Sequence, residues 1–447
     1  EVRKMLFKTK YESRFKEKGR FKMNIDIKMD AMEDPFSVIP PAEKMIVFLR
    51  QHIGIEAKPL INVGDSVQYG QKIGDTPENK PKVVPIHSPV NGKVLDIRKM
   101  RHPVSGELEN AVIIETENSS QASLLDPLNF EKVTSETLID RVREAGIVGL
   151  GGAAFPTHVK LNPNRKISHL IINAKESDPN IACDIRLMIE KPQEIVKGII
   201  MMKKILDVKD ITVATRTQQS EKPEFEDLLK KHEIRLTRMH PCYSIGSERL
   251  LIKEILDKEV PSGKFPPDIG VIVHNIATAY AVYEAIEKGE PLISRGITFY
   301  SEDVGGKNLW VRMGTPIKHI IKHIGESPSK FERIVLGSMM MGPTVPNPSD
   351  PILKSTSAIT AFTNEEPDPY RKPFPCIRCG YCNTVCPVFI YPQLIMEAEK
   401  NENVKRLKKL HIEDCIDCGL CSYVCPSRIR FTKYLTSGKR RIRNQTN

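Results

Sequence analysis

The fold of this chain is decided near its C-terminus, in the stretch Cys376-Ile-Arg-Cys379-Gly-Tyr-Cys382-Asn-Thr-Val-Cys386-Pro387. After a charged stretch with a helical pattern, the same spacing returns as Cys415-Ile-Asp-Cys418-Gly-Leu-Cys421-Ser-Tyr-Val-Cys425-Pro426. Three thiols two residues apart on a tight loop can face one centre, whereas the fourth stands at the start of the following helix and points away from it. The two blocks therefore predict two metal centres that exchange one ligand.

This spacing is typical of chains that hold two [4Fe–4S] clusters. We expect one cluster at Cys376, Cys379, Cys382 and Cys425, and the other at Cys386, Cys415, Cys418 and Cys421. Gly380 and Gly419 would let the loops approach the sulfur atoms closely. Structural zinc explains neither four cysteines in each block nor their duplication, and disulfides are unexpected without an export signal. Two adjacent clusters predict a chain that moves single electrons.

The composition is that of a soluble globular protein with several domains. The chain has 447 residues, of which 40% are hydrophobic and 28% charged, which is enough for about three domains of ~150 residues. No stretch approaches the roughly 18 apolar residues that a membrane helix needs, and the N-terminal pattern is not that of a signal peptide. These features predict a location in the reducing cytoplasm.

The formal net charge of +11 is concentrated at the two ends of the chain. Residues 1–22 form a basic tail with a net charge of +6, and the last ten residues add +4. Because the part between them is nearly neutral, a nucleic-acid groove is not expected. Basic ends suit an anionic membrane surface or an acidic partner, and they are equally consistent with solvated tails.

Residues 45–115 have the pattern of short strands separated by Gly, Pro and Asn. The alternation of V-G-D-x-V-x-x-G-Q with S-P-V-x-G-x-V resembles a barrel-sandwich hybrid, the architecture of lipoyl and biotinyl domains. The pair Asn91-Gly92 predicts a two-residue hairpin. Lys93 follows this turn inside the next strand and is therefore not expected to be a modified carrier lysine, so the domain is predicted to have a structural or docking role.

A glycine-rich stretch follows a predicted helix at 133–145 and reads Gly146-Ile-Val-Gly149-Leu-Gly151-Gly152-Ala-Ala-Phe155-Pro156-Thr157-His158-Val-Lys160. Backbone N–H groups of such a loop can bind a phosphate, and Lys160 could neutralise its charge. The pattern is neither the dinucleotide fingerprint nor a Walker loop. A tight glycine turn without a ligand therefore remains an alternative.

An apolar strand, Leu170-Ile-Ile-Asn173, ends in the polar cluster Asn173-Ala-Lys175-Glu176-Ser177-Asp178. Polar side chains at the ends of strands are how α/β folds build ligand sites. Helices are predicted at 194–206, 223–232, 248–257 and 278–286, and strands at 211–214 and 269–275. On their own, Glu248 and Asn275 would be helix caps or surface residues.

Taken together, these stretches resemble the RnfC family, the C subunits of the Rnf electron-transport complexes, over roughly residues 40–435. The order of motifs carries this resemblance: the barrel-sandwich segment, G-L-G-G-A-x-F-P-T-x-x-K, N-x-x-E-x-[DE]-P, Y-x-x-G-x-E-x-L-L-I, V-P-S-G, and the two cysteine blocks. The middle domain is also similar to the flavin subunit of respiratory complex I, which oxidises NADH at FMN.

The resemblance implies residues for binding FMN and NAD(H). Gly149, Gly151, Gly152 and Lys160 match an FMN-phosphate cradle, and Phe155 matches an aromatic residue that stacks near the nicotinamide or adenine. Asn173 and Asn275 match residues around the flavin, and Glu176 is the acid of the N-x-x-E motif. Asp178 stands where the family usually has Glu, and Glu248 matches an acid near the NADH ribose.

Three residues depart from the family pattern. Lys175 stands at a position that is acidic in the complex I subunit, Ala154 replaces a glycine, and His274 replaces an asparagine beside the flavin. A lysine near the flavin ring would favour an anionic reduced flavin or block the site. Cys183 and Cys242 match no motif and are expected to be buried structural thiols.

The predicted fold is α/β multidomain. It consists of a barrel-sandwich hybrid (23–120), a Rossmann-like FMN/NADH domain (121–290), a β-grasp domain (291–345), a linker (346–372) and an α-helical ferredoxin domain with two [4Fe–4S] clusters (373–447). No catalytic side chain is expected, because the cofactors carry the chemistry.

The implied function is that of a peripheral electron-input subunit of an ion-translocating NAD:ferredoxin oxidoreductase, an enzyme of the translocase class. Electrons would pass between NAD(H), FMN and the two clusters at the cytoplasmic face of the cell membrane. The expected partners are the membrane subunits of the same complex and a ferredoxin-like subunit, with membrane contact through partners and no nucleic acid. The alternatives are a soluble flavin iron–sulfur reductase of the cobalamin-reductase type and a docking or electron-wire subunit without flavin.

Overall fold

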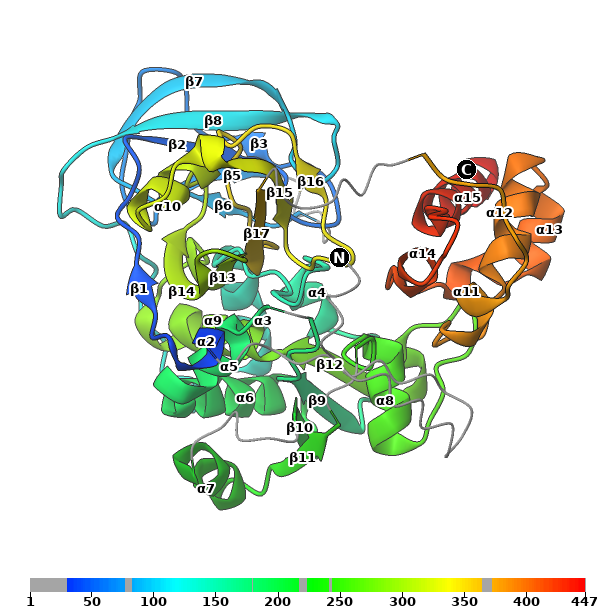
Figure 1. Cartoon of the computed structure of the whole chain (residues 1–447). Coiled ribbons are helices and arrows are strands. Elements are labelled where there is room, and N and C mark those ends of the chain that lie inside the picture. The colour runs from blue at the N-terminus through cyan, green and yellow to red at the C-terminus, as the bar shows by residue number, and fades with distance from the viewer. Residues whose placement is uncertain are drawn as a thin grey trace. The chain divides into compact units, whose positions relative to one another are not determined.

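The computed structural model describes residues 30–76, 83–178, 180–216, 223–240, 243–363 and 372–446 (Figure 1). They fall into two compact units. The larger unit contains the described residues between 27 and 240 and between 270 and 364, and the cysteine unit contains those between 241 and 269 and between 365 and 447. None of the described helices is long and apolar enough to cross a membrane. The predicted basic tail 1–22 lies outside the described residues.

The N-terminal part of the larger unit consists of two small antiparallel sheets around one core. Met45, Val47, Ile73, Ile86 and Ile114 come from both sheets and are buried in this core, as expected for strands that alternate between apolar and polar residues. One sheet has the order β2 (Lys44–Phe48), β8 (Leu108–Thr116), β7 (Gly92–Arg101), β4 (Ser66–Val67), and the other has the order β3 (Lys58–Pro59), β5 (Lys72–Asp75), β6 (Ile86–His87).

The Asn91-Gly92 pair does not form the predicted two-residue hairpin, so this prediction is wrong. The strands on its two sides, β6 and β7, belong to different sheets. The side chain of Asn91 accepts a hydrogen bond from Tyr69 N at 2.9 Å and donates one to Ser119 O at 2.7 Å. Gly92 is needed for a close approach of two strands, because a Cβ atom there would lie 2.0 Å from Glu115 O.

The next part of the chain in the larger unit forms a four-stranded parallel sheet, seen in the lower part of Figure 1. The chain moves outward from the central strand through its neighbour to one edge and then returns to its other side, so the strand order reverses beside the central strand. At such a reversal an open crevice lies at the carboxyl ends of the strands. The order is β11 (Arg235–Met239), β10 (Asp210–Arg216), β9 (His169–Asn173), β12 (Val271–Asn275).

Helices accompany the parallel sheet near the positions that the periodicity predicts. Helices α6 (Pro192–Leu206) and α9 (Ile276–Tyr283) pack closely against each other, since a Cβ atom at Gly198 would lie 1.9 Å from Ala279 O. The last of the predicted helices, at 278–286, is α9 followed by a π-helical turn. The helices are α3 (Ser135–Glu144), α4 (Thr157–Lys160), α5 (Cys183–Glu190), α6 (Pro192–Leu206), α7 (Pro223–Lys231), α9 (Ile276–Tyr283) and η2 (Glu284–Lys288).

A six-stranded sheet completes the larger unit and includes strands from two segments that the sequence analysis assigned to other parts of the chain. Residues 358–363, expected in a linker, form β17, which pairs with β13 and β15 inside the sheet. Residues 37–38, expected in the barrel-sandwich part, form β1 at the edge of this sheet. Its order is β1 (Ser37–Val38), β14 (Gly305–Arg312), β13 (Ser294–Ser301), β17 (Ala358–Thr363), β15 (Phe331–Leu336), β16 (Thr344–Val345). The helices next to these strands in the sequence are α2 (Asp30–Glu33), α10 (Ile317–His323) and η3 (Pro328–Lys330).

The cysteine unit is helical and includes a segment that the sequence placed in the flavin domain. Residues 243–269, predicted as part of the domain 121–290, belong to this unit. Its core is made of Ile395, Leu407, Ile412, Phe431 and Leu435. The helices are α8 (Glu248–Leu256), η1 (Pro266–Ile269), α11 (Tyr381–Thr384), α12 (Pro392–Lys400), α13 (Val404–Lys409), η4 (Ile412–Asp414), α14 (Leu420–Tyr423) and α15 (Phe431–Thr446).

Candidate functional site

The crevice of the larger unit lies where β9 and β12 end side by side. Asn173 and Asn275 are the last residues of these strands and are partners in the parallel register. Asn275 also begins α9, since its side chain accepts a hydrogen bond from Ala277 N at 2.9 Å. Its Nδ2 donates to Asp184 Oδ2 at 2.6 Å. The two asparagines predicted from the sequence are thus brought together at the reversal of strand order.

The predicted glycine loop adjoins Asn275. A Cβ atom at Gly151 would lie 3.2 Å from the Cβ of Asn275, and Leu150 N donates to Thr278 Oγ1 in α9 at 2.9 Å. Gly152 has φ +102°, and the space around its missing Cβ is open, so the backbone conformation itself requires glycine. The loop therefore lies next to the start of α9, where an anion is favoured.

Two backbone amides of this loop, those of Gly151 and Gly152, are available to a ligand. Gly149 N is used inside the loop and donates to Phe155 O at 2.8 Å. Within the described ranges, the N–H groups of Gly151 and Gly152 have no backbone acceptor, and both residues are exposed. Phe155 is 40% exposed, and Lys160 ends the short helix α4 that follows the loop. These residues fit the phosphate of a flavin nucleotide.

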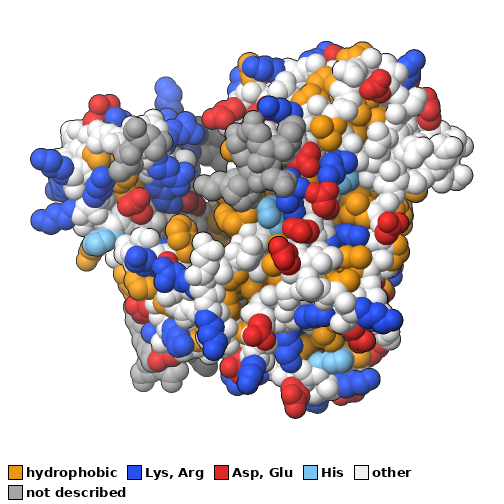
Figure 2. Space-filling model, turned by 180° about the vertical axis from the view of Figure 1, so that it is seen from behind, with side chains coloured by type: hydrophobic (Ala, Val, Ile, Leu, Met, Phe, Trp, Pro, Cys, Tyr) orange, Lys and Arg blue, Asp and Glu red, His pale blue; other side chains and the backbone are white. Residues whose placement is uncertain are grey.

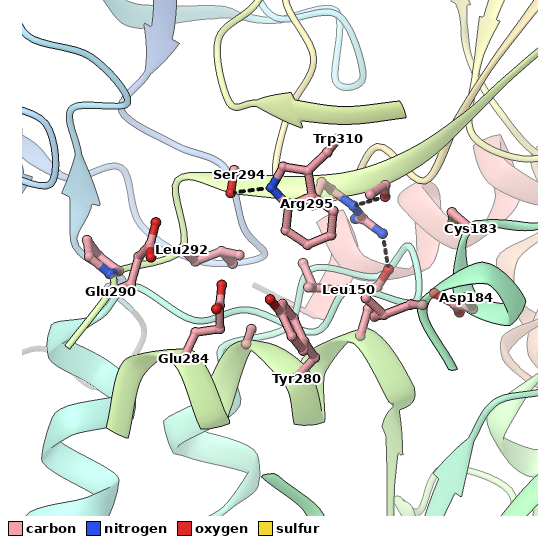
Figure 3. A pocket seen from close by; sticks show the side chains of 15 residues that line it. Leu150, Cys183, Asp184, Tyr280, Glu284, Glu290, Leu292, Ser294, Arg295 and Trp310 are labelled. Atoms are coloured by element: carbon pink, nitrogen blue, oxygen red, sulfur yellow. Dashed lines mark hydrogen bonds between the residues drawn. The ribbon is translucent and has the colours of Figure 1, made fainter. Parts of the chain in front are cut away.

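Arg295 holds the glycine loop from the six-stranded sheet (Figure 3). This arginine is 2% exposed. It donates from Nη2 to Leu150 O at 3.1 Å and from Nη1 to Lys354 O at 2.6 Å. Burial lowers its pKa, and the nearby Cys183, Asp184 and Glu176 oppose that effect. Arg295 belongs to none of the sequence motifs, because nothing in its local pattern indicates burial.

Acidic side chains gather beside Asn275. Asp184 N donates to Glu176 Oε2 at 3.4 Å. Burial raises the pKa of Glu176 well above its usual value, and the charges of Asp184 and Asp178 add to the effect. Burial likewise raises the pKa values of Asp184 and Asp178. A cluster of acids that titrate above their usual range can hold a proton next to the crevice.

The structure accommodates the three residues that depart from the family pattern. Lys175 is buried. Burial raises the pKa of Asp178, and the charge of Lys175 opposes this effect. Ala154 adopts φ 48°, and its carbonyl accepts a hydrogen bond from Ile53 N at 3.1 Å. His274 is buried in β12, and burial together with the charge of Lys160 lowers its pKa well below the usual value. The imidazole is therefore neutral at pH 7.

Two buried polar atoms also favour a ligand at the crevice. His274 Nε2 and Thr157 Oγ1 have no hydrogen-bond partner in the part of the chain that the structure describes. Unsatisfied buried polar atoms are rare and require an explanation. His274 belongs to the strand that ends at the crevice, and Thr157 begins the helix after the glycine loop. Both residues are thus close in the chain to groups that border the crevice.

A separate narrow pocket is lined in part by Leu150 of the glycine loop. Tyr280 and Glu284 project into it from the helical segment α9–η2, and Trp310 faces them from β14 (Figure 3). Its interior volume of about 20 Å³ is space for roughly one water molecule. This pocket is too small for a flavin ring and is therefore not the candidate cofactor site.

The cysteine unit contains a pocket of about 460 Å³ whose lining includes Cys376, Cys379, Cys382 and Cys425. These cysteines come from both blocks and are the set that the spacing predicts for one cluster. Burial raises the pKa of the Cys382 thiol to about 11, with further contributions from the other three cysteines. The four sulfur atoms are thus neighbours across the two blocks.

The remaining four cysteines form a second group. Burial raises the pKa of Cys421, and the charges of Cys418, Cys415 and Cys386 add to this effect. The repeat extends to the backbone, because Gly380 and Gly419 have φ values of 79° and 78°. All eight cysteines are free thiols in the structure. Both groups fit the donor set of a [4Fe–4S] cluster.

The segment that contains Glu248 contacts the second cysteine block. Tyr243 Oη donates to Cys418 O at 2.7 Å. Asp414, directly before Cys415, accepts hydrogen bonds from Arg249 Nη1 at 3.2 Å and from Ser262 Oγ at 2.8 Å. Glu248 begins α8 in this unit, whereas the glycine loop belongs to the larger unit.

The two unassigned cysteines have different outcomes. Cys183 is buried, its Sγ donates to Ser357 O at 3.4 Å, and burial raises its pKa well above the usual value. These features agree with the structural role expected from the sequence. Cys242 lies outside the described residues.

Family models match three parts of the chain. Residues 24–119 match the RnfC barrel sandwich hybrid domain, residues 142–284 the Nuo51 FMN-binding domain, and residues 375–429 the 4Fe-4S dicluster domain. The chain thus carries an FMN-binding domain and a domain for two [4Fe–4S] clusters, as the glycine loop and the cysteine blocks predicted. The predicted α/β multidomain fold class is confirmed.

A solved structure shares the fold. The crystal structure of an NAD+-reducing [NiFe]-hydrogenase in the H2-reduced state is similar with a TM-score of 0.50 and 16% sequence identity. The similarity covers 71% of this chain and 63% of that chain. At this identity the match supports the fold alone.

Curated relatives align with most of the chain. The C subunit of the ion-translocating oxidoreductase complex of Pectobacterium carotovorum subsp. carotovorum is 35% identical over 428 residues, which cover 94% of this chain and 56% of the relative. The protein of the same name from Rhodobacter capsulatus is 39% identical over 355 residues, covering 77% of this chain and 67% of the relative. The chain thus spans between about half and two thirds of the length of these relatives. It belongs to the RnfC family, the C subunits of the ion-translocating oxidoreductase complexes.

Proposed function

We propose that this protein is the peripheral electron-input subunit of a membrane-bound, ion-translocating NAD:ferredoxin oxidoreductase. It would pass electrons between NAD(H), FMN and two [4Fe–4S] clusters at the cytoplasmic face of the membrane. The observation that carries the proposal is that one chain combines a glycine loop at a reversal of strand order with two groups of four cysteines. A bound flavin supplies two-electron exchange with NAD(H) and one-electron exchange with a cluster.

Each part of the crevice has a proposed role. The amides of Gly151 and Gly152, with Lys160, would bind the FMN phosphate, and Gly149, whose N–H donates to Phe155 O, would shape the loop around it. Asn173 and Asn275 would contact the flavin, and Phe155 the nicotinamide or adenine. Glu176 and Asp178, whose pKa values are raised by burial, would hold or release the proton that accompanies hydride exchange. Glu248 would bind the ribose of NADH.

The proposed partners follow from the family. The chain would join membrane subunits of the same complex, and these would supply the ion path. A ferredoxin-like subunit would exchange electrons with its clusters. A soluble reductase of the cobalamin-reductase type would need no such partners. Co-purification of the membrane subunits with a tagged chain supports the first assignment, and a chain that purifies alone supports the second.

A second candidate is a docking and electron-wire subunit that lacks flavin. The observation in its favour is the buried Lys175 beside the crevice. Burial raises the pKa of Asp178, however, and the charge of Lys175 opposes this effect, so the lysine has an acidic neighbour. The amides of the glycine loop and the polar atoms of His274 and Thr157 favour a bound nucleotide.

An anaerobic spectrum separates these candidates. The iron–sulfur-reconstituted protein is mixed with FMN and recorded before and after addition of NADH. We expect the flavin absorbance to fall first and the cluster absorbance to follow. If no flavin binds and NADH leaves the clusters oxidised, the wire subunit is the correct assignment.

A pair of variants locates the flavin. Lys160→Met should weaken FMN binding at least tenfold, as measured by quenching of flavin fluorescence, because a charge on the phosphate loses its partner. Lys166→Met is the matched control, since Lys166 is exposed and lies beyond the loop. Equal affinities in the two variants would contradict the proposed phosphate site.

A further inference from the structure

The two cysteine blocks are sequence repeats, and their surfaces differ. In the first block, Ile377, Tyr381 and Phe389 are 67%, 57% and 58% exposed. Their equivalents in the second block are Ile416, which is half-buried, Leu420, which is 2% exposed, and the charged Arg428. The same structural positions are thus apolar and open in one block, and covered or charged in the other.

The difference extends to the cysteines. Cys376 and Cys379 of the first block are exposed, whereas the equivalent Cys415 and Cys418 of the second are half-buried. The segment at 243–262 accounts for part of this difference, because Tyr243 bonds to Cys418 and Ser262 bonds to Asp414. Within the described residues, no comparable segment bonds to the loop from Cys376 to Cys382.

The backbone that carries the exposed side chains of the first block is held in place. Phe374 is 63% exposed, yet its backbone is held by a hydrogen bond from its N–H to Ser427 O at 2.9 Å. Phe389 has φ 57° and its equivalent Arg428 has φ 53°, so the two blocks share this backbone conformation and differ in the side chain that it carries. Ile377 and Tyr381 line the same pocket as Cys376, Cys379 and Cys382. Large exposed apolar side chains beside a redox centre mark a contact surface for another protein.

The charges around this surface indicate the kind of partner. Residues 372–446 carry fourteen Lys or Arg and six Asp or Glu, and Figure 2 shows basic side chains spread over this part of the chain, at the left of the view. Arg378 lies in the first loop itself, where the second block has Asp417. An apolar centre with a basic surround is complementary to an acidic protein.

We propose that the face around Ile377 and Tyr381, beside the first group of cysteines, docks an acidic one-electron carrier protein. The cluster at Cys376, Cys379, Cys382 and Cys425 is then the terminal that exchanges electrons with this carrier. The inference rests on the proposed function in that these cysteines hold a cluster. One electron leaves the reduced cluster and enters the oxidised carrier, with no atom transferred, so the carrier is the only co-reactant.

The experiment uses the full chain with its clusters, reduced by dithionite, and a small acidic ferredoxin with two [4Fe–4S] clusters as the probe. Stopped-flow absorbance gives the second-order rate of electron transfer. We expect Ile377→Glu and Tyr381→Glu each to lower this rate at least tenfold, and the wild-type rate to fall as ionic strength rises. Leu108→Glu is the matched control, because Leu108 is also 67% exposed and lies in the larger unit.

A second measurement does not depend on electron transfer. Calorimetric titration of the oxidised probe into the oxidised protein should show a loss of affinity in Ile377→Glu and Tyr381→Glu, with an unchanged iron content and cluster EPR signal. Unchanged rate and affinity in both variants would overturn the proposal, as would an equal loss in Leu108→Glu. If the variants instead lose only binding to vesicles of anionic lipid, the face is a membrane contact and the proposal is wrong.

The test is independent of the flavin. Dithionite reduces the clusters directly, so a protein that fails to bind FMN or to react with NADH can still be assayed for docking. Failure of the NADH experiment with intact docking would contradict the proposed function alone. Failure of docking with an intact NADH response would contradict this inference alone.

Discussion

The hydroxyl of Tyr243 donates a hydrogen bond of 2.7 Å to the backbone carbonyl of Cys418. Tyr243 belongs to a segment that precedes the cysteine blocks by more than a hundred residues, and its side chain is partly buried at this contact. A donor aimed at the ligand loop stabilises negative charge there. The cluster of the second block is therefore surrounded by groups from two distant parts of the sequence.

Tyr243→Phe should lower the reduction potential of the cluster at Cys415, Cys418 and Cys421. Removing one neutral hydrogen bond costs about 1 kcal/mol, which corresponds to a shift on the order of tens of millivolts for a one-electron couple. Redox titration followed by EPR measures it. Tyr391→Phe, at an exposed tyrosine, should leave both potentials unchanged, and an equal shift in the two variants would refute the role of Tyr243.

Cys386→Ala should remove the cluster of the other block. The single variant is expected to retain about four of about eight iron atoms, because each [4Fe–4S] cluster takes its fourth ligand from the opposite block. Cys386→Ala combined with Cys415→Ala should also retain about four iron atoms, whereas Cys386→Ala combined with Cys376→Ala should retain none. The reverse result for the two pairs would show that each block binds its own cluster.

Gly198→Ala should destabilise the larger unit although alanine favours helices. Propensity alone predicts a gain of about 1 kcal/mol in α6, but the new Cβ would lie 1.9 Å from Ala279 O, a backbone atom of α9. We expect a net loss of about 2 kcal/mol in the free energy of unfolding, measured by denaturant titration. Gly438→Ala in α15 is the comparison, because its Cβ would meet the flexible Ile412 side chain at 2.6 Å. A smaller loss is expected there.

Lys354 should make the stability depend on pH. Burial lowers its pKa to about 7 from 10.5, while its Nζ donates to Gly146 O at 2.7 Å and Pro85 O at 3.2 Å. Between these pKa values the unfolded chain binds more protons than the folded one. The free energy of unfolding should therefore rise with pH from about 7 to about 10.5, by at most about 1.4 kcal/mol per pH unit.

Variants at two lysines isolate this effect. Lys354→Met should remove the dependence on pH in that window, because the group with this shifted pKa is lost. The nearby His87 is kept neutral by burial and does not contribute there. Lys44→Met, at an exposed position of β2, should keep the wild-type slope. If Lys354→Met keeps it as well, the slope has another origin.

The sequence was informative where structure and chemistry depend on local spacing. The eight cysteines, the glycine loop and the strands that end at Asn173 and Asn275 are visible as motifs, because their geometry is set by a few neighbouring residues. The boundaries were less predictable. Residues 358–363 look like part of a Pro-rich linker, and only their pairing with β13 and β15 makes them a strand.

Buried charges could not be predicted from the sequence. Arg295 and Lys354 have no motif, and their burial depends on contacts with residues 145 and 208 positions away. The hairpin predicted at Asn91-Gly92 was wrong for a related reason. Pairing with strands that are distant in the sequence decides which sheet each flanking strand joins. Tertiary packing, rather than turn preference, decided the outcome in each case.

The hydrogen bonds from Arg295 to Leu150 and from Lys354 to Gly146 also set an order of events during synthesis. The glycine loop leaves the ribosome before the side chains that hold it, which follow 145 and 208 residues later. At a translation rate of roughly 5–20 residues per second, the delay is about 10–40 s. The nascent chain therefore cannot complete this loop while the loop is emerging, and the loop is held in its final form only after Lys354 has been synthesised.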